Sequence, residues 1–126
     1  MPGYTYDTGA LIAAERNDRR VWALHQGVLS EGLTPTVPAV VLAQGWRGGP
    51  QPQMSRLLSG CRIETLSEAV ARSAGSACAL AGTSDVVDAA VVVGACARGD
   101  IVVTSDERDL LHIAAALGVA LRTRQA

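Results

Sequence analysis

Aspartates are the residues of this sequence whose positions best suit chemistry. Asp7 and Asp106 each come just after a segment typical of a sheet strand, and Asp88 lies in the first turn of a predicted helix. Asp85 and Asp109 lie three residues from Asp88 and Asp106, so each pair shares one face of a helical turn. Because ligands of open parallel sheets bind at the carboxyl edge, we expect Asp7, Asp88 and Asp106 to meet there.

Carboxylates gathered from distant segments repel one another, and a bound cation relieves that repulsion. A helix N-terminus stabilises a nearby acid by only about 0.3–1 kcal/mol. Hard oxygen ligands favour Mg²⁺ or Mn²⁺, and magnesium keeps several waters while it binds a few carboxylates. Such an ion can activate water and stabilise the charge of an in-line phosphoryl displacement. The sequence therefore predicts a metal-dependent site that acts on a phosphodiester.

Strands that alternate with helices must position these acids. Five strands are predicted, at Tyr4–Tyr6, Thr34–Val37, Arg62–Leu66, Ile101–Thr104 and Val119–Arg122. Helices are predicted at Ala10–Glu15, from an Asp18 cap to Gly32, at Ala39–Arg47 and Met54–Leu58, from a Ser67 cap to Ala81, at Asp85–Arg98 and at Glu107–Leu117. The alternation implies right-handed βαβ crossovers and a parallel sheet. We expect one α/β domain that spans residues 1–126.

Composition limits the function classes. The 126 residues are 48% hydrophobic, which is ample for one core, and the three cysteines have neither disulfide-framework nor zinc-site spacing. No segment reads as a secretion signal, and none approaches the ~20 apolar residues of a membrane span. A cytoplasmic protein is therefore expected. The net charge is −1 and all eleven fixed cations are arginines, so attraction to RNA must be local, through arginine or a metal ion.

Three motifs resemble the PIN-domain family, and within it the VapC toxins of bacterial VapBC toxin–antitoxin pairs. Residues 6–12 (YDTGALI) are similar to the family's opening strand and first acid, Asp7. Asp88-Ala89-Ala90 resembles the helix-borne acid with its small followers, and residues 103–110 (VTSDERDL) resemble the final acidic motif, with Asp106 as principal and Asp109 as auxiliary acid. The resemblance covers essentially the whole chain.

The resemblance implies a PIN-like three-layer α/β/α sandwich around a mostly parallel sheet of four to five strands. It also implies a metal-dependent endoribonuclease whose Asp7, Asp88, Asp106 and Asp109 bind Mg²⁺ or Mn²⁺. The partners it implies are an RNA substrate, a VapB-like antitoxin that wraps the first helices, and a second copy of the chain in a homodimer. No membrane association is implied.

One position departs from the family pattern. The family's second acid usually lies on the helix after the second strand, and the aligned residue here is Gln44. Glutamine carries no charge, but its carbonyl oxygen can still serve a metal ion or the water bound to it. Gln44 is therefore included in the catalytic set with Asp7, Asp88, Asp106 and Asp109. The alternative is a catalytically weakened PIN-fold protein that binds an antitoxin or RNA.

Several of these residues also have purely structural interpretations. Asp7 and Asp85 are each suited to cap the helix that follows, and Asp109 is suited to act on a metal through water. Thr104 and Glu107 have the spacing of a capping box. The two histidines share no metal-ligand spacing and are expected at surface or half-buried helix positions, without a chemical role. Arg47 and Arg108 flank the presumed site, where phosphate contact and simple solvation are both open.

Overall fold

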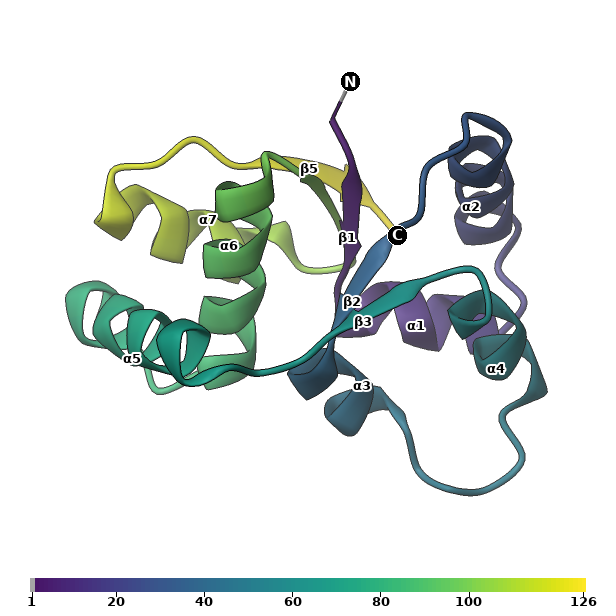
Figure 1. Cartoon of the computed structure of the whole chain (residues 1–126), viewed down its shortest axis with the longest axis horizontal. Helices are drawn as coiled ribbons and strands as arrows, with labels where there is room; N and C mark the ends of the chain where they lie inside the picture. The colour runs from purple at the N-terminus through teal and green to yellow at the C-terminus, as the bar shows by residue number, and fades with distance from the viewer. Residues whose placement is uncertain (1) are drawn as a thin grey trace.

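A parallel sheet runs through the centre of the molecule, as a computed structural model that describes residues 2–126 shows (Figure 1). Its five strands are β1 (Tyr4–Tyr6), β2 (Thr36–Pro38), β3 (Arg62–Glu64), β4 (Ile101–Thr104) and β5 (Arg122–Gln125). They lie in the order β3-β2-β1-β4-β5, and every neighbouring pair is parallel. The carboxyl ends of all five strands therefore share one edge, with β1 in the middle.

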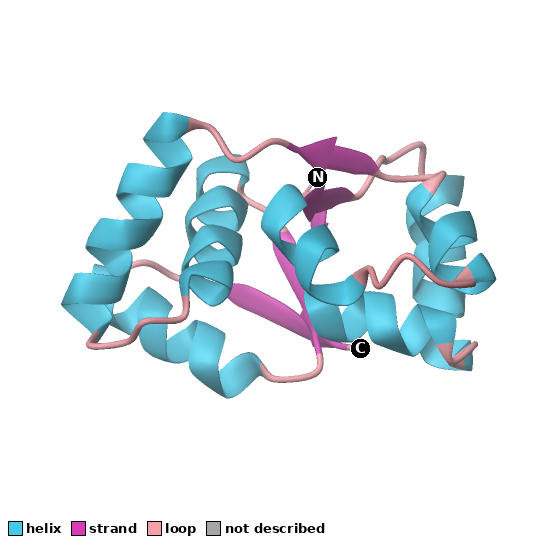
Figure 2. Ribbon diagram, turned by 90° about the horizontal axis from the view of Figure 1, so that it is seen from below, coloured by secondary structure: helices cyan, strands magenta, loops and turns pink. Residues whose placement is uncertain are grey.

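Helices cover both faces of the sheet. On one side lie α1 (Thr8–Glu15), α2 (Arg19–Ser30), α3 (Ala39–Gly45) and α4 (Pro52–Leu58), and on the other α5 (Glu68–Ala81), α6 (Val86–Arg98) and α7 (Glu107–Leu117). Figures 1 and 2 show the two groups of helices separated by the strands. The result is the predicted three-layer α/β/α sandwich with a five-stranded parallel sheet.

Small side chains fill the space between the layers. Ala10, Ala14, Ala89 and Ala90 are at most 3% exposed, and they let α1 and α6 approach the strands closely. Larger aliphatic side chains complete the core, among them Leu11, Val37, Val41, Leu57, Val91, Val92, Val102, Val103 and Leu110. This packing fits a sequence with many alanines and valines and no phenylalanine.

Most helix boundaries follow signals that the sequence carries. The Asp18 carboxylate accepts from the backbone N–H groups of Arg20 and Val21, and the Ser67 hydroxyl oxygen accepts from Val70 N, so both predicted caps are confirmed. Gly99 ends α6 and Gly118 ends α7, both in the left-handed conformation that suits glycine. Helix α1 begins two residues before the predicted start because Asp7 caps it.

The prediction for the last strand was wrong. It placed the strand at Val119–Arg122, where two apolar residues suggest burial, but β5 covers Arg122–Gln125 and pairs with β4 from Ile101–Arg122 to Thr104–Gln125. Val119 is instead 39% exposed. The strand lies at an edge of the sheet, so backbone pairing and not side-chain burial sets its position. Strands β2 and β3 are also each displaced or shorter by one to two residues at their ends.

Within residues 2–126, no single helix is long and apolar enough to cross a bilayer. Helices α5 and α6 reach that length and composition only as a pair, and the pair is bent by 112°.

Candidate active site

Asp7 stands at the carboxyl end of the central strand and is held there by three hydrogen bonds. Its Oδ1 accepts from Thr8 N at 2.8 Å, and its Oδ2 accepts from Thr104 Oγ1 at 2.9 Å. Its backbone N–H donates to Val103 O at 3.0 Å, which ties it to β4. The residue is 7% exposed. Asp7 is therefore both the N-cap of α1 and a fixed carboxylate at the edge where ligands bind in parallel sheets.

Thr104 joins Asp7 to the loop that carries Asp106. Its hydroxyl donates to Asp7 and accepts from Asp106 N at 3.0 Å. The predicted capping box of Thr104 and Glu107 is therefore wrong, because Glu107 Oε2 instead accepts from Thr123 Oγ1 at 2.6 Å. Asp106 is the N-cap of α7 by position, but its side chain makes no capping hydrogen bond. Its carboxylate is exposed and available to a ligand.

Asp88 projects from the first turn of α6 into a small polar pocket. The pocket has a volume of about 120 Å³ and is lined by Thr83, Asp85, Asp88, Asp109, His112 and Ile113. Asp85 Oδ1 accepts from Asp88 N at 3.0 Å, so the capping interpretation of Asp85 is confirmed. Two of the predicted metal ligands, Asp88 and Asp109, thus share one pocket although they lie on different helices.

Burial and neighbouring carboxylates raise the pKa values of two of these acids. The pKa of Asp88 is raised to about 7, first by burial and then by the negative charges of Asp85, Asp7 and Asp109 and a hydrogen bond with Asp85. Burial also raises the pKa of Asp7, with smaller contributions from the charges of Asp85 and Asp106, although hydrogen bonds from Thr8 and Thr104 oppose the rise. Acids from three separate segments therefore share one electrostatic environment.

The donor set suits a hard divalent cation, but it is not a closed set of ligands. Among residues 2–126, no three His, Cys, Asp or Glu side chains stand close enough together to hold a metal ion as they are. Magnesium keeps several waters and needs only one or two carboxylates, so a partly open arrangement of oxygens remains compatible with it. Ligation by Asp7, Asp88, Asp106 and Asp109 stays a prediction that fits the chemistry of these side chains.

Gln44 lies beside the acidic residues. It is exposed near the end of α3, and its Oε1 accepts a hydrogen bond from Thr8 Oγ1 at 2.6 Å. Thr8 directly follows Asp7 and also donates its backbone N–H to the Asp7 carboxylate. The sequence placed Gln44 at the site, but it assigned the amide oxygen to a metal or its water, and in the structure this oxygen already has a protein partner.

The structure also shows where His112, Arg108 and Arg47 lie. His112 lines the pocket of Asp88, where its Nε2 lies 2.8 Å from Ala81 O; the spacing of three residues from Asp109 is the signal that could have found it. Arg108 lines a polar hollow of about 420 Å³ with Ser105, Asp106, Glu107, Asp109 and Gln125. Arg47 is turned back to the end of α3, where its Nη1 donates to Trp46 O at 2.8 Å.

The expectation for His25 was wrong. This side chain is 3% exposed, and its Nδ1 lies 2.8 Å from the Tyr6 hydroxyl. Burial, and then the charge of Arg56, lowers the pKa of the imidazole. His25 therefore joins α2 to the central strand as a neutral, buried group.

Gly9 allows the first helix to approach the loop after β4. A Cβ atom on this glycine would lie 2.8 Å from Ser105 Cβ and 2.9 Å from Ser105 N, which is shorter than carbon contacts allow. The two segments that carry Asp7 and Asp106 thus meet at van der Waals distance only because residue 9 has no side chain.

Comparison with solved structures identifies the fold. At the level of sequence, no family model and no curated protein matches this chain. A chain of the crystal structure of VapBC2 from Rickettsia felis, bound to a DNA fragment from their promoter, superposes with a TM-score of 0.69 at 16% identity, over 98% of both chains. The chain has the fold of this protein. The PIN-like sandwich implied by the resemblance to VapC is thereby confirmed at the level of the fold.

Two further solved structures agree. A chain of DNA-bound VapBC from Salmonella typhimurium is 18% identical, with a TM-score of 0.69 and coverage of 99% of this chain and 98% of that one. PAE2754 from Pyrobaculum aerophilum is 14% identical, with a TM-score of 0.66 and coverage of 97% and 83%. The likeness extends from end to end of the described chain, so the acidic pocket lies on a complete copy of this fold.

Proposed function

We propose that this chain is a metal-dependent endoribonuclease, the toxin of a toxin–antitoxin pair, in which Asp7, Asp88, Asp106 and Asp109 bind Mg²⁺ or Mn²⁺. The observation that carries the proposal is that acids from separate segments converge, because Asp88 and Asp109 line one pocket from two helices and the charge of Asp7 acts on Asp88. A structure that keeps mutually repelling carboxylates together gains most from a cation between them. Perturbed acids of this kind cluster at functional sites.

The side chains have distinct tasks in this proposal. Asp7 is held in one orientation by Thr8 and Thr104, so its carboxylate needs no reorganisation when a ligand arrives. Asp88 is poised to release its proton near neutral pH, when a cation enters the pocket. A bound divalent ion supplies an activated water and stabilises the charge of the transferring phosphoryl group. Arg108, in the hollow beside Asp106, is placed to contact the phosphate backbone of RNA.

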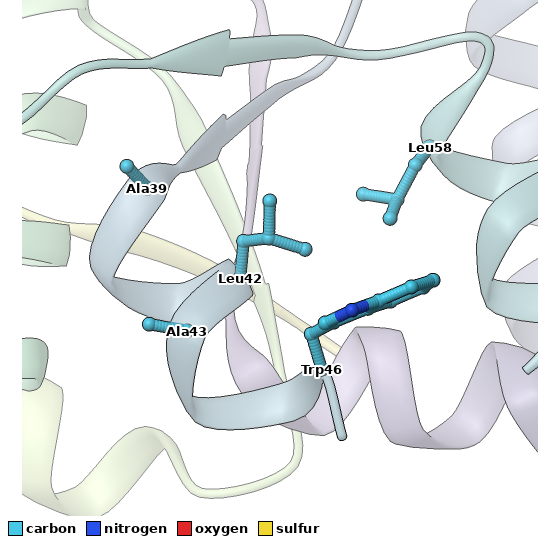
Figure 3. Close-up of a pocket in the computed structure, with 5 residues that line it drawn as sticks. All are labelled: Ala39, Leu42, Ala43, Trp46 and Leu58. Carbon is cyan, nitrogen blue, oxygen red and sulfur yellow. The ribbon is translucent and has the colours of Figure 1, made fainter. Parts of the chain in front are cut away.

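The proposed partner is a VapB-like antitoxin. Two of the structural neighbours are VapBC structures. An apolar hollow of about 410 Å³ lies between α3 and α4, where Leu42 and Trp46 face Leu58 (Figure 3). Trp46 is 40% exposed there, so the hollow presents a large apolar side chain to solvent. We propose that apolar side chains of the antitoxin bind in this hollow, that the toxin forms a homodimer, and that the pair acts in the cytoplasm.

Cleavage of a structured RNA tests the nuclease proposal. The wild-type chain should cut RNA in Mn²⁺ or Mg²⁺ and stop cutting in EDTA. Asp7→Asn should not cut RNA even when Mn²⁺ or Mg²⁺ is present. The matched control is Glu68→Gln, which makes the same charge change at an exposed side chain of α5. Equal cutting by wild type and Asp7→Asn would exclude a mechanism that uses this site. An inactive wild type that still binds RNA or an antitoxin would favour the weakened binding protein instead.

A further inference from the structure

The hydroxyl of Thr8 orients the side-chain amide of Gln44 and so determines which amide atoms can bind a ligand. Thr8 Oγ1 donates to Gln44 Oε1 at 2.6 Å, a short distance for this kind of hydrogen bond. Within residues 2–126, the side-chain amide of Gln44 makes this one hydrogen bond. This bond uses one lone pair of the amide oxygen and fixes the orientation of the amide, while the two N–H groups of Nε2 have no hydrogen-bond partner among residues 2–126, on an exposed side chain next to the Asp7–Thr8 segment.

Free N–H donors at this position suit an oxygen anion and not a cation. A carboxylate here would add another negative charge next to Asp7, which directly precedes Thr8. A neutral amide adds none, and its donors match the non-bridging oxygens of a phosphodiester. A metal ion at Gln44 would have to share the amide oxygen with the Thr8 hydroxyl.

We propose that Gln44 binds a non-bridging phosphate oxygen of the RNA through its Nε2 donors and is not a metal ligand, with Thr8 as the positioning residue that fixes the amide. This inference rests on the proposed ribonuclease function and deepens it, because it names the residue that recognises the substrate's phosphate. It also explains why glutamine stands where the PIN-domain family usually has its second acid, because the position would bind substrate and not metal.

Substitution of Gln44 separates the two roles because they predict opposite effects. For a phosphate donor, Gln44→Ala leaves Mn²⁺ affinity in calorimetric titration unchanged and weakens RNA binding roughly tenfold, the effect of one lost hydrogen bond to a charged group. Gln44→Glu weakens RNA binding further, because a carboxylate repels phosphate. For a metal ligand, Gln44→Ala weakens Mn²⁺ binding and Gln44→Glu strengthens both Mn²⁺ binding and cleavage.

RNA binding is measured by fluorescence anisotropy of a labelled single-stranded RNA at low salt, in EDTA and in Mn²⁺, and cleavage is followed in Mn²⁺. The KM for RNA should rise in Gln44→Ala while kcat changes little. Thr8→Val should show a smaller rise in KM, and Thr8→Ser, which keeps the hydroxyl, should match the wild type. Gln26→Ala and Gln26→Glu make the same changes at an exposed glutamine of α2 and serve as controls.

The outcomes distinguish this inference from the function on which it rests. If Asp7→Asn loses cleavage but Gln44→Ala keeps the RNA affinity and KM of the wild type, the inference about Gln44 is overturned and the proposed function stands. Weaker Mn²⁺ binding by Gln44→Ala, or more active Gln44→Glu, also overturns it and restores the metal-ligand role. If the wild-type chain neither binds nor cuts RNA, the proposed function and the inference fall together.

Discussion

The carboxylate of Asp88 destabilises the metal-free protein, and Asp88→Asn should therefore make that protein more stable. The pKa of Asp88 rises from the ordinary value of 3.8 to about 7 on folding. Three pKa units correspond to about 4 kcal/mol, at ~1.4 kcal/mol per unit. Because the side chain is only half-buried, solvent screening reduces the expected effect to about 1–2 kcal/mol.

The sign follows from which state binds the proton more tightly. The folded state holds the Asp88 proton up to about pH 7, whereas the unfolded chain releases it near pH 4. The contribution of Asp88 to wild-type stability should therefore fall as the pH rises between these values. Asp88→Asn lacks this titration, so its advantage should be largest at about pH 8 and shrink towards about pH 5.

Urea unfolding in EDTA, followed by circular dichroism across this pH range, measures the difference. Glu68→Gln serves as the control, because it makes the same charge change at an exposed side chain that does not line the pocket of Asp88. Addition of Mn²⁺ should remove the advantage of Asp88→Asn, since a cation stabilises the charged form of the wild type. A variant that is less stable than wild type near pH 8, or a difference that does not change with pH, would refute the reasoning.

Three more predictions concern the elements that support the site. Gly9→Ala should lower the free energy of unfolding by about 1–3 kcal/mol in urea, because the clash of the new Cβ with Ser105 outweighs the ~1 kcal/mol by which alanine stabilises a helix relative to glycine. An unchanged urea midpoint would show that the loop moves to relieve the clash. Arg98→Met should cost about 2–4 kcal/mol by thermal unfolding, because it removes the cation beside the Asp100 carboxylate, which is 8% exposed and keeps its hydrogen bond from Thr5. Adding Asp100→Asn should recover part of the loss, and no recovery would contradict the ion-pair explanation. The contribution of His25 to stability should change in the opposite direction to that of Asp88 and be lost as the pH falls below about 6.5, because the pKa of the buried imidazole is lowered in the folded state. The difference in unfolding free energy between wild type and His25→Gln measures it, and a difference that stays constant with pH would disprove it.

Local signals in the sequence predicted much of the fold correctly. The caps at Asp18 and Ser67 and the stop at Gly99 depend on a few neighbouring residues, so the sequence alone reveals them. The apolar run of β4 also reads plainly as a buried strand. Strand β5 could not be predicted in this way, because backbone pairing holds its polar residues and their sequence has no hydrophobic pattern.

Contacts between distant segments could not be predicted in the same way. The bond from Thr104 to Asp7 spans 97 positions, and the capping box that the sequence suggested at Thr104 depends on four residues only. The local pattern was present, but the longer contact prevailed. The orientation of the Gln44 amide was equally hidden, since it depends on a threonine 36 positions away.

The buried state of His25 depends on a similar long-range pairing with Tyr6. An imidazole on an amphipathic helix gives no sign in the sequence of the phenol that it will meet. The residue types at the site were therefore predictable from the sequence, whereas the hydrogen bonds that orient them required the tertiary structure.

The two edge strands, β3 and β5, both carry arginines: Arg62 lies on β3, and Arg122 and Arg124 lie on β5. Charged side chains on an edge discourage a further strand from pairing there, because a second chain would have to bring its own charges alongside them. Fibre-like growth by strand addition is thus disfavoured at both margins. Copies of this chain should meet through helical surfaces, and the sheet should keep its length in any assembly.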